Sequence, residues 1–436
     1  MRSPSTFVVA AFAALAGCAS PAVHPTAIPD AMTNTAPVYL LPTIESTVLP
    51  EATSEPEAVF LPELAAEEYV IPPTLQHAWP GGATIFFELA EETTVTILTA
   101  HQDAGPWRVA LRPGTGQRFL LPVQDLVPGE TYEIAVGVPD SAGAYHPPSF
   151  LGERWGPLRL HVPEAAPASV RLVVLGDSGY GDPVTRDLAA AAADYAPDAT
   201  VHLGDLVYRG EEEGSAAQAY ARKFYSALEP LLESGPIYPV LGNHELDGPV
   251  SPDGVPYYFT AFPSLPEWCC GDEASSGRRE WYRVVFGSWQ FLFLNSQAFY
   301  GYGDGEAQNA WLERQLGDPA FAGTIPVMHI APFSGGLHTN DGGPLRSSWH
   351  PRFVAADIPL VLAGHDHNYE RLLVDGVAYI VSGGGSSVLY AKEEELPGEA
   401  IFTADNHFLL LELGPDSLQV QAITELGEVI DQYTWP

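Results

Sequence analysis

Two patterns of apolar and polar positions divide the chain. Before about residue 164, short runs of β-branched and aromatic residues alternate with turn residues, and little of the sequence has a helical period. The runs are ATIFFEL, TTVTILTA, WRVALRP, QRFLLPV, ETYEIAVGV and LRLHVPE. Six short strands at this spacing predict a small all-β sandwich at residues 67–164.

From about residue 168 the pattern changes to strand, loop and helix. SVRLVVLGDSG, DATVHLGDLVY and PIYPVLGNHE predict buried strands, with helices between them at residues 185–195 and 215–232. Further strands are predicted at WYRVVF, WQFLFLN, TIPVMHI and PLVLAGH, and antiparallel strands in the tail at VAYIVSG, HFLLLEL and SLQVQAI. Repeated β-α units predict a layered α/β domain over residues 168–436.

The first residues, MRSPSTFVVAAFAALAGCAS, have one cation, a short apolar run and then small residues. This pattern predicts a signal peptide at residues 1–18, because the apolar run is too short for a permanent membrane span. LAGC resembles a bacterial lipobox, which implies a lipid anchor on Cys18; the alternative is an ordinary secretion signal with an incidental cysteine. Residues 19–66 are rich in Pro, Thr and Glu and predict an extended tether. We expect an exported lipoprotein of the bacterial cell envelope, on the outer membrane or cell surface.

The charge of the chain limits its expected classes of partner, and its cysteines limit its expected disulfides. The chain has 55 Asp and Glu against 19 Lys and Arg, a formal charge of -36. That balance argues against nucleic acid or anionic lipid as a bulk partner, so an anionic substrate needs local positive charge, which bound metal ions supply most simply. Cys269 and Cys270 are adjacent and cannot join distant segments; they form either a vicinal disulfide or two thiols.

Five apolar strands end in polar residues, most of them beside glycine. The segments are GDSG (176–179), GDLVY (204–208), GNHE (242–245), MHIAPF (328–333) and GHDH (364–367). Glycine permits a tight turn, after which the polar side chain projects from the carboxyl edge of the sheet. Because such ends lie side by side in a parallel-type sheet, we expect convergence of Asp177, Asp205, Asn243, His329, His365 and His367.

These six side chains form a mixed oxygen and nitrogen donor set. Such a set suits iron, manganese or zinc and contains too much nitrogen for calcium. With Tyr208 as a seventh donor, it exceeds what one tetrahedral zinc ion needs. We therefore predict two metal ions about 3.5–4 Å apart with one bridging carboxylate, a geometry that stabilises both the attacking and the leaving oxygen at phosphorus.

The five segments together resemble the calcineurin-like metallophosphoesterases, and among them the purple acid phosphatases. The family pattern GDxG, GDxxY, GNH(E/D), VxxH and GHxH is matched by GDSG, GDLVY, GNHE, PVMH and GHDH. Pro326 replaces the usual Val of the fourth block, at a position that is not a ligand. The resemblance covers residues 170 to about 387 and implies a four-layer αββα sandwich. The preceding all-β sandwich, with Tyr132 four residues after Pro128, resembles the tyrosine corner of fibronectin type III-like domains, although a plain hairpin would also bury this tyrosine.

Carried over by position, the resemblance implies two metal sites. The first is an iron(III) site of Asp177, Asp205, Tyr208 and His367. The second is a site for divalent iron, zinc or manganese, made of Asp205, Asn243, His329 and His365, so that Asp205 bridges the ions. Tyr208 discriminates between metal assignments: as a ligand it favours ferric iron and gives a visible charge-transfer band, whereas as a core tyrosine it would leave a site for two divalent ions.

The resemblance also implies an activity, hydrolysis of small phosphomonoesters by a metal-bound hydroxide. His244 resembles the family's phosphate-orienting histidine, which could protonate the leaving alkoxide, and His338 resembles a second one. Each could instead hold a metal ligand in place. Two rivals remain: a phosphodiesterase or nucleotide hydrolase on the same scaffold, and a surface-binding lipoprotein without activity. Tyr208 and the two histidines favour the monoester.

Overall fold

The computed structural model describes residues 58–102, 105–248, 250–251, 255–265, 280–316 and 318–435. The predicted signal peptide with Cys18, most of the predicted tether, and Cys269 and Cys270 lie outside these residues. None of the helices in the described ranges is both long and apolar enough to cross a membrane.

The first part of the described chain is built from strands. They are β1 (Tyr69–Trp79), β2 (Gly82–His101), β3 (Arg108–Val123), β4 (Thr131–Pro139), β5 (Tyr145–His146), β6 (Ser149–Phe150), β7 (Glu153–Arg154) and β8 (Leu158–His161). β2 pairs antiparallel with β1, β3 and β4, and β8 pairs with β4. Tyr132 is buried, and its hydroxyl accepts a hydrogen bond from the Val127 N–H at 3.3 Å.

This region differs from the six short strands expected. The first two predicted runs are one strand, β2, and the third and fourth are one strand, β3. The pairing of β2 with β3 shifts register between Glu88 and Thr93, so the first part of β2 pairs with β1 and the last part with β4. A bulge of this kind bends a strand without ending it, and its polar residues resemble a turn in the sequence.

The remaining strands form two mixed sheets. Their order is β11-β10-β9-β19-β20-β21 in one sheet and β12-β13-β14-β15-β17-β16-β18 in the other. Their bounds are β9 (Val170–Leu175), β10 (Ala199–His202), β11 (Ile237–Pro239), β12 (Tyr282–Phe286), β13 (Trp289–Phe293), β14 (Gly323–Ile330), β15 (Leu360–Gly364), β16 (Tyr369–Val374), β17 (Val377–Ser382), β18 (Glu399–Thr403), β19 (Phe408–Leu413), β20 (Leu418–Ile423) and β21 (Val429–Trp435).

The helices follow the apolar periodicity of the sequence. They are α1 (Pro183–Ala193), α2 (Ala216–Tyr220), α3 (Ser226–Ser234), α4 (His244–Asp247), α5 (Tyr258–Ala261), α6 (Gly305–Leu316), α7 (Gly343–Ser348) and α8 (His350–Ala355). α1 begins where Asp182 accepts a hydrogen bond from the Thr185 N–H, with Pro183 in the first turn. The helix predicted at residues 215–232 is α2 and α3 joined by a π-helical turn at Ala221–Tyr225.

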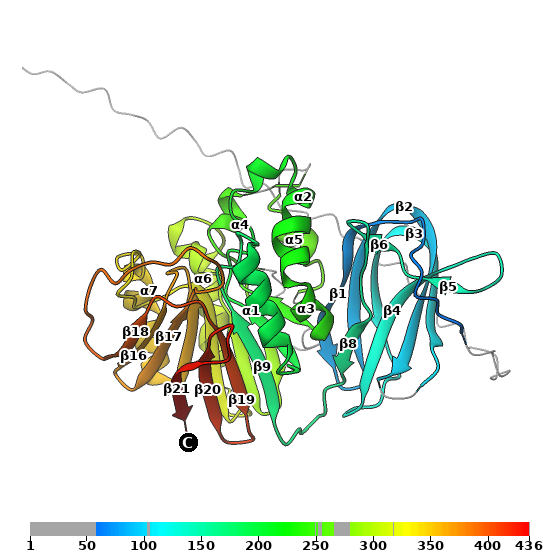
Figure 1. Cartoon of the computed structure of the whole chain (residues 1–436). Coiled ribbons are helices and arrows are strands. Elements are labelled where there is room, and N and C mark those ends of the chain that lie inside the picture. The colour runs from blue at the N-terminus through cyan, green and yellow to red at the C-terminus, as the bar shows by residue number, and fades with distance from the viewer. Residues whose placement is uncertain are drawn as a thin grey trace, which may run out of the picture. The chain divides into compact units, whose positions relative to one another are not determined.

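The sheets and helices stack in four layers, because central strands of both sheets, such as β10, β15 and β17, bury both of their faces. In β14, Ile325 and Val327 join the core between the sheets, whereas Met328 and Ile330 join a second core with residues of α6, α7 and α8. Alternation of this kind follows from the two-residue period of a strand. Helix α1 covers the sheet that contains β9 and β19 (Figure 1).

The two-sheet arrangement corrects the expectation of one parallel-type sheet edge. Strands β9, β10 and β11 are parallel neighbours, but β14 and β15 belong to the second sheet. The reason is that β9 pairs antiparallel with β19, which extends the first sheet away from β14. The strand ends therefore meet across the two inner sheets rather than along one.

Candidate metal centre

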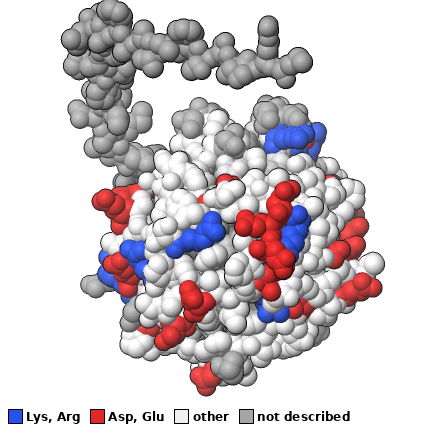
Figure 2. All heavy atoms as spheres, turned by 90° about the vertical axis from the view of Figure 1, so that its left-hand side faces the viewer, with Lys and Arg blue, Asp and Glu red and all other residues white. Residues whose placement is uncertain are grey.

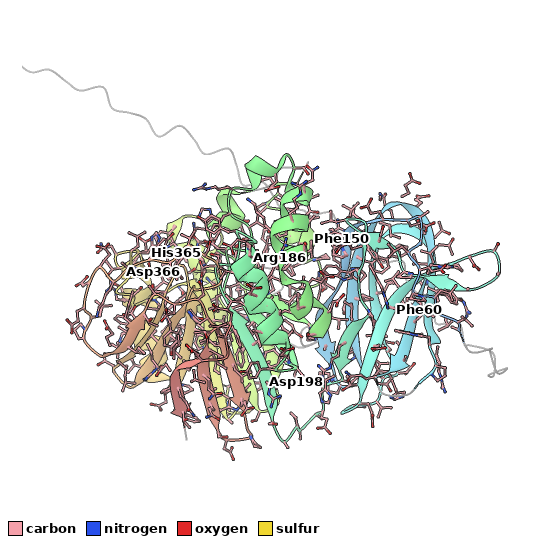
Figure 3. The ribbon with its side chains drawn as sticks, in the orientation of Figure 1. Phe60, Phe150, Arg186, Asp198, His365 and Asp366 are labelled. Atoms are coloured by element: carbon pink, nitrogen blue, oxygen red, sulfur yellow. The ribbon has the colours of Figure 1, made fainter. Side chains whose placement is uncertain are left out.

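Three of the predicted ligands have an unusual backbone. Asp177, Asp205 and His365 have φ angles of 60°, 56° and 72°, in the left-handed region that residues other than glycine rarely adopt. Asp177 and Asp205 lie just beyond the parallel strands β9 and β10, and His365 just after β15. Figure 3 shows His365 near the opposite edge of the sheets from Asp198, which precedes β10. Such strain, about 1–3 kcal/mol per residue, persists where the surrounding structure fixes the conformation.

The first donor cluster contains Asp177, Tyr208 and His367, all buried. The Tyr208 hydroxyl lies 3.1 Å from Asp177 Oδ1 and 2.9 Å from His367 Nε2, and His367 Nε2 lies 3.7 Å from Asp177 Oδ1. His367 Nδ1 lies 2.8 Å from the Val388 carbonyl oxygen, so Nδ1 carries the proton and Nε2 keeps a free lone pair. Burial lowers the pKa of His367 to about 4, which keeps the ring neutral as metal binding requires.

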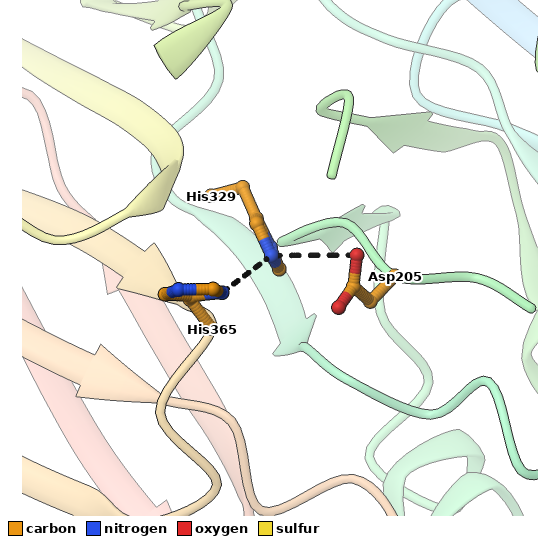
Figure 4. Close-up of side chains that lie close together, drawn as sticks. All are labelled: Asp205, His329 and His365. Carbon is orange, nitrogen blue, oxygen red and sulfur yellow. Dashed lines mark hydrogen bonds and ion pairs between the residues drawn. The ribbon is translucent and has the colours of Figure 1, made fainter. Parts of the chain in front are cut away.

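The second cluster is centred on His329. Its Nε2 atom lies 3.3 Å from Asp205 Oδ1, 3.0 Å from Asn243 Oδ1 and 3.2 Å from His365 Nδ1. Figure 4 shows His329 between Asp205 and His365. His329 Nδ1 lies 2.8 Å from the Leu203 carbonyl oxygen, so its Nε2 is the nitrogen that faces the other donors. The second cluster thus presents two oxygens and two ring nitrogens to one small space.

Buried charges act strongly on each other in the second cluster. Burial lowers the pKa of His329, but the carboxylate of Asp205 more than compensates and raises it to about 10. Burial raises the pKa of Asp205, and the same contact with His329 outweighs this effect and lowers it. Both shifts favour a positive charge where these groups converge, and a bound cation would supply that charge.

In the first cluster, the carboxylate of Asp177 lies close to a second carboxylate, that of Asp205. Burial raises the pKa of Asp177 well above its usual value; His329 lowers it and the charge of Asp205 raises it. Two buried carboxylates close to one another favour a bound cation. Carboxylate, phenol, amide and imidazole donors fit iron, zinc or manganese, so the residues fit the predicted ions.

The two histidines predicted to contact phosphate lie one beside each cluster. The His244 ring packs edge-on against Tyr208, at 4.8 Å between centroids, and the backbone N–H of His244 donates to Asp205 Oδ1 at 3.0 Å. The His338 ring lies 4.1 Å from that of His365. Both side chains are partly exposed, as are Asn243 and His365, whereas the other five cluster residues are buried. The structure thus brings all nine predicted site residues into one region.

A comparison with family models agrees with this arrangement. The model of the calcineurin-like phosphoesterases matches residues 170–369. This region belongs to the calcineurin-like phosphoesterase family. The matched residues contain both donor clusters and both neighbouring histidines.

Known proteins similar to this calcineurin-like domain support its fold more strongly than a particular activity. Two uncharacterized proteins of Mycobacterium tuberculosis are 30% identical over 212 residues, which is 44% of this chain and 38% of each relative. The chain thus spans well under half the length of these relatives. A purple acid phosphatase from yellow lupin (Lupinus luteus) seeds has a TM-score of 0.61 at 16% identity, over 83% of this chain and 73% of that chain. A structure of PhoD has a TM-score of 0.59 at 13% identity, over 86% and 90%. These structures confirm the predicted metallophosphoesterase fold.

Several polar residues of the calcineurin-like site were not assigned a role from the sequence. Glu245 accepts the N–H groups of Asp205, Leu206 and Gly242, at 2.9, 2.7 and 2.8 Å. Asp341 contacts His338 and His365, Asp366 accepts the His338 N–H, and the Tyr390 ring stacks on His367 at 4.2 Å. Glu245 and Asp366 lie inside the motifs, but Asp341 and Tyr390 do not follow an apolar run.

Proposed function

We propose that the chain is an exported, metal-dependent phosphatase that hydrolyses small phosphomonoesters at a binuclear centre. The observation that carries this proposal is the division of seven predicted ligands into two adjacent, largely buried clusters, one with a tyrosine and one with two imidazoles, an amide and a carboxylate. A single ion would not need both sets of donors.

The donors of each cluster support a different ion. Tyr208 with Asp177 and His367 supports ferric iron, because a phenolate is a hard, anionic donor. The His329 cluster supports a divalent ion of iron, zinc or manganese, with Asp205 as the bridge. When bound, the ions would neutralise phosphate oxygens and lower the pKa of a coordinated water.

The chain's own side chains would orient the phosphate and move the proton. His244 and His338 are partly exposed beside the buried donors, where their ring N–H groups can reach phosphate oxygens. Because His338 Nδ1 contacts Asp341, its Nε2 is the nitrogen that remains for a substrate. Either ring could then give a proton to the leaving alkoxide.

The proposal is tested by comparing a chromogenic phosphomonoester with the matching diester, using the full-length, metal-loaded chain. We expect kcat/KM for the monoester to exceed that for the diester by at least tenfold, and Asp205→Ala to abolish both activities. A preference for the diester would replace the function by that of a phosphodiesterase. No hydrolysis of either ester, with two ions bound, would contradict an enzymatic role.

A further inference from the structure

The carboxylate of Asp341 contacts two imidazoles at once. Its Oδ2 atom lies 3.0 Å from His365 Nε2 and 3.1 Å from His338 Nδ1. The two rings lie 4.1 Å apart and are tilted by 35°, so both nitrogens approach the same oxygen. A carboxylate oxygen can accept hydrogen bonds only, so both ring nitrogens are donors here.

The first contact fixes the tautomer of His365. Its Nδ1 atom faces His329 Nε2 at 3.2 Å, inside the second donor cluster. Since Nε2 donates to Asp341, Nδ1 carries the lone pair that a metal ion would use. This is the carboxylate and histidine pairing that orients metal-bound imidazoles in many proteins.

The second contact fixes the side chain of His338, whose backbone is held by another carboxylate. The His338 N–H donates to Asp366 Oδ1 at 2.9 Å, and Asp366 is buried and hydrogen-bonded by Ser334. The remaining freedom of His338 is rotation of its side chain. Its contact with Asp341 selects one orientation, in which Nε2 faces away from the carboxylate.

Asp341 is itself held in place by its backbone. Its N–H donates to the His338 carbonyl at 2.9 Å, and its own carbonyl accepts a hydrogen bond from the Tyr300 hydroxyl. The side chain remains 43% exposed, so its substitution leaves the core of the domain unchanged. The backbone hydrogen bonds of this turn, rather than side-chain packing, therefore fix the direction of the carboxylate.

We propose that Asp341 is a positioning residue that orients both His365, for the divalent ion, and His338, for the substrate phosphate. The proposal rests on the proposed function for the roles of these two histidines, and it deepens that function. One carboxylate would then couple metal binding to phosphate binding.

The first test measures Mn²⁺ binding to full-length protein stripped of metal, by calorimetry. Asp341→Ala should weaken one of the two Mn²⁺ sites by about 10- to 100-fold, as the loss of a carboxylate behind a ligating histidine does elsewhere, and leave the other site unchanged. Asp341→Glu should restore part of the affinity. Asp187→Asn, an exposed carboxylate on α1, is the matched control and should bind Mn²⁺ as the wild type does. Unchanged Mn²⁺ affinity in Asp341→Ala would overturn the proposal. If the Ala variant does not fold, Asp341→Asn, which keeps the side-chain volume, takes its place in the same measurement.

The second test measures the affinity for inorganic phosphate at saturating Mn²⁺, in a double-mutant cycle with His338. Asp341→Ala and His338→Ala should each weaken phosphate binding by about tenfold, the loss expected for one charged hydrogen bond. If Asp341 acts through His338, the double variant should bind phosphate no more weakly than His338→Ala alone. Independent, multiplicative losses would overturn the coupling.

Both tests are binding measurements and require no turnover. A wild-type protein that binds two ions and phosphate, yet hydrolyses no ester, would end the proposed function but leave the role of Asp341 intact. Conversely, an active wild type whose Asp341 variants bind Mn²⁺ and phosphate normally would end only the positioning role.

Discussion

At the scale of single residues, the proposed iron assignment rests on Tyr208. Its hydroxyl is buried within hydrogen-bond distance of Asp177 and His367, rather than packed against apolar neighbours alone. Burial raises the pKa of the phenol, and the charges of Asp177 and Asp205 raise it further. A phenolate in this position requires a strongly charged cation close by, which favours ferric iron over a second divalent ion.

Tyr208→Phe should therefore abolish a visible charge-transfer band while the protein keeps its divalent ion. The measurement is the absorption spectrum of iron-loaded protein, together with its metal content. Tyr390→Phe is the matched control, because it keeps the ring that stacks on His367 and leaves the Tyr208 hydroxyl in place, and the band should remain. A colourless wild type with two bound divalent ions would contradict the iron assignment.

Which residues could be predicted depends on where they lie in the sequence. Eight of the nine site residues lie in the five strand-end motifs, so the strand-end pattern and the family resemblance together predict them, whereas His338 is predicted by the resemblance alone. Asp341 lies in a loop after no such run, and its role arises from two histidines that are 27 positions apart, as the numbers 338 and 365 show. Only the three-dimensional arrangement reveals a contact of that kind.

At the scale of elements, Glu245 joins a strand end to a short helix. From α4 it accepts three backbone N–H groups, two from the turn after β10 and one from the turn after β11. These turns carry Asp205 and Asn243, so the side chain holds two ligands of the second cluster in register. Burial raises the pKa of Glu245 to about 7, and the charge of Asp205 raises it as well.

Glu245→Ala should lower the free energy of unfolding by about 3 kcal/mol, because it leaves three buried donors without their acceptor. Urea denaturation followed by circular dichroism measures the change. Glu306→Ala, an exposed residue in the first turn of α6, is the control and should change stability by less than about 0.5 kcal/mol. Equal stabilities of the two variants would show that Glu245 does not hold these turns.

Glu233 gives α3 a pH-dependent contact. Its carboxylate accepts the Gly156 N–H at 2.6 Å. Burial raises its pKa from 4.5 to about 7; Gly156 and Arg154 lower it, and Glu229 raises it. The folded chain holds this proton to higher pH than the unfolded chain. The contribution of Glu233 to the free energy of unfolding is therefore fully present below about pH 4.5 and is lost as the pH rises to about 7.

Replacing Glu233 by Gln keeps an acceptor for Gly156 and removes the charge. The variant should match the wild type at about pH 4 and be more stable at about pH 8 by about 2 kcal/mol. Urea unfolding at both pH values measures this. If the difference in the free energy of unfolding between variant and wild type is the same at both pH values, the pKa of Glu233 does not change on folding.

The prediction of elements succeeded where the apolar period was regular and failed where strands bend or join other sheets. The strands β9, β10 and β15 were found because each is a continuous apolar run that stops at glycine or histidine. The bend in β2 has polar residues at its bulge and resembles a turn in the sequence. The pairing of β9 with β19 joins segments that only the folded chain brings together, so the two-sheet arrangement could not be derived from strand ends alone.

At the scale of the whole molecule, negative charge and the first residues set the proposed location. On the face shown in Figure 2, acidic side chains gather in groups with a few Lys and Arg side chains between them. With a formal charge of -36, attachment to an anionic membrane surface by charge alone would be unfavourable. A covalent lipid on Cys18 would supply the attachment, since two or more acyl chains hold a protein firmly.

Cys18→Ser in the full-length chain, expressed in a bacterial host, should move the protein from the membrane fraction to the soluble fraction. Fractionation and immunoblotting measure the shift. Cys269→Ser is the matched control and should stay with the membranes. Membrane association of both variants, or of neither, would exclude an anchor on Cys18.

The most direct test of the account counts the metal ions bound per chain, by elemental mass spectrometry of the full-length protein. The two-cluster arrangement predicts two ions per wild-type chain, and Asp205→Ala should hold fewer than one because its carboxylate would bridge both ions. Asp187→Asn should keep both. A single ion per wild-type chain at saturating metal, or two ions that persist in Asp205→Ala, would contradict the binuclear centre.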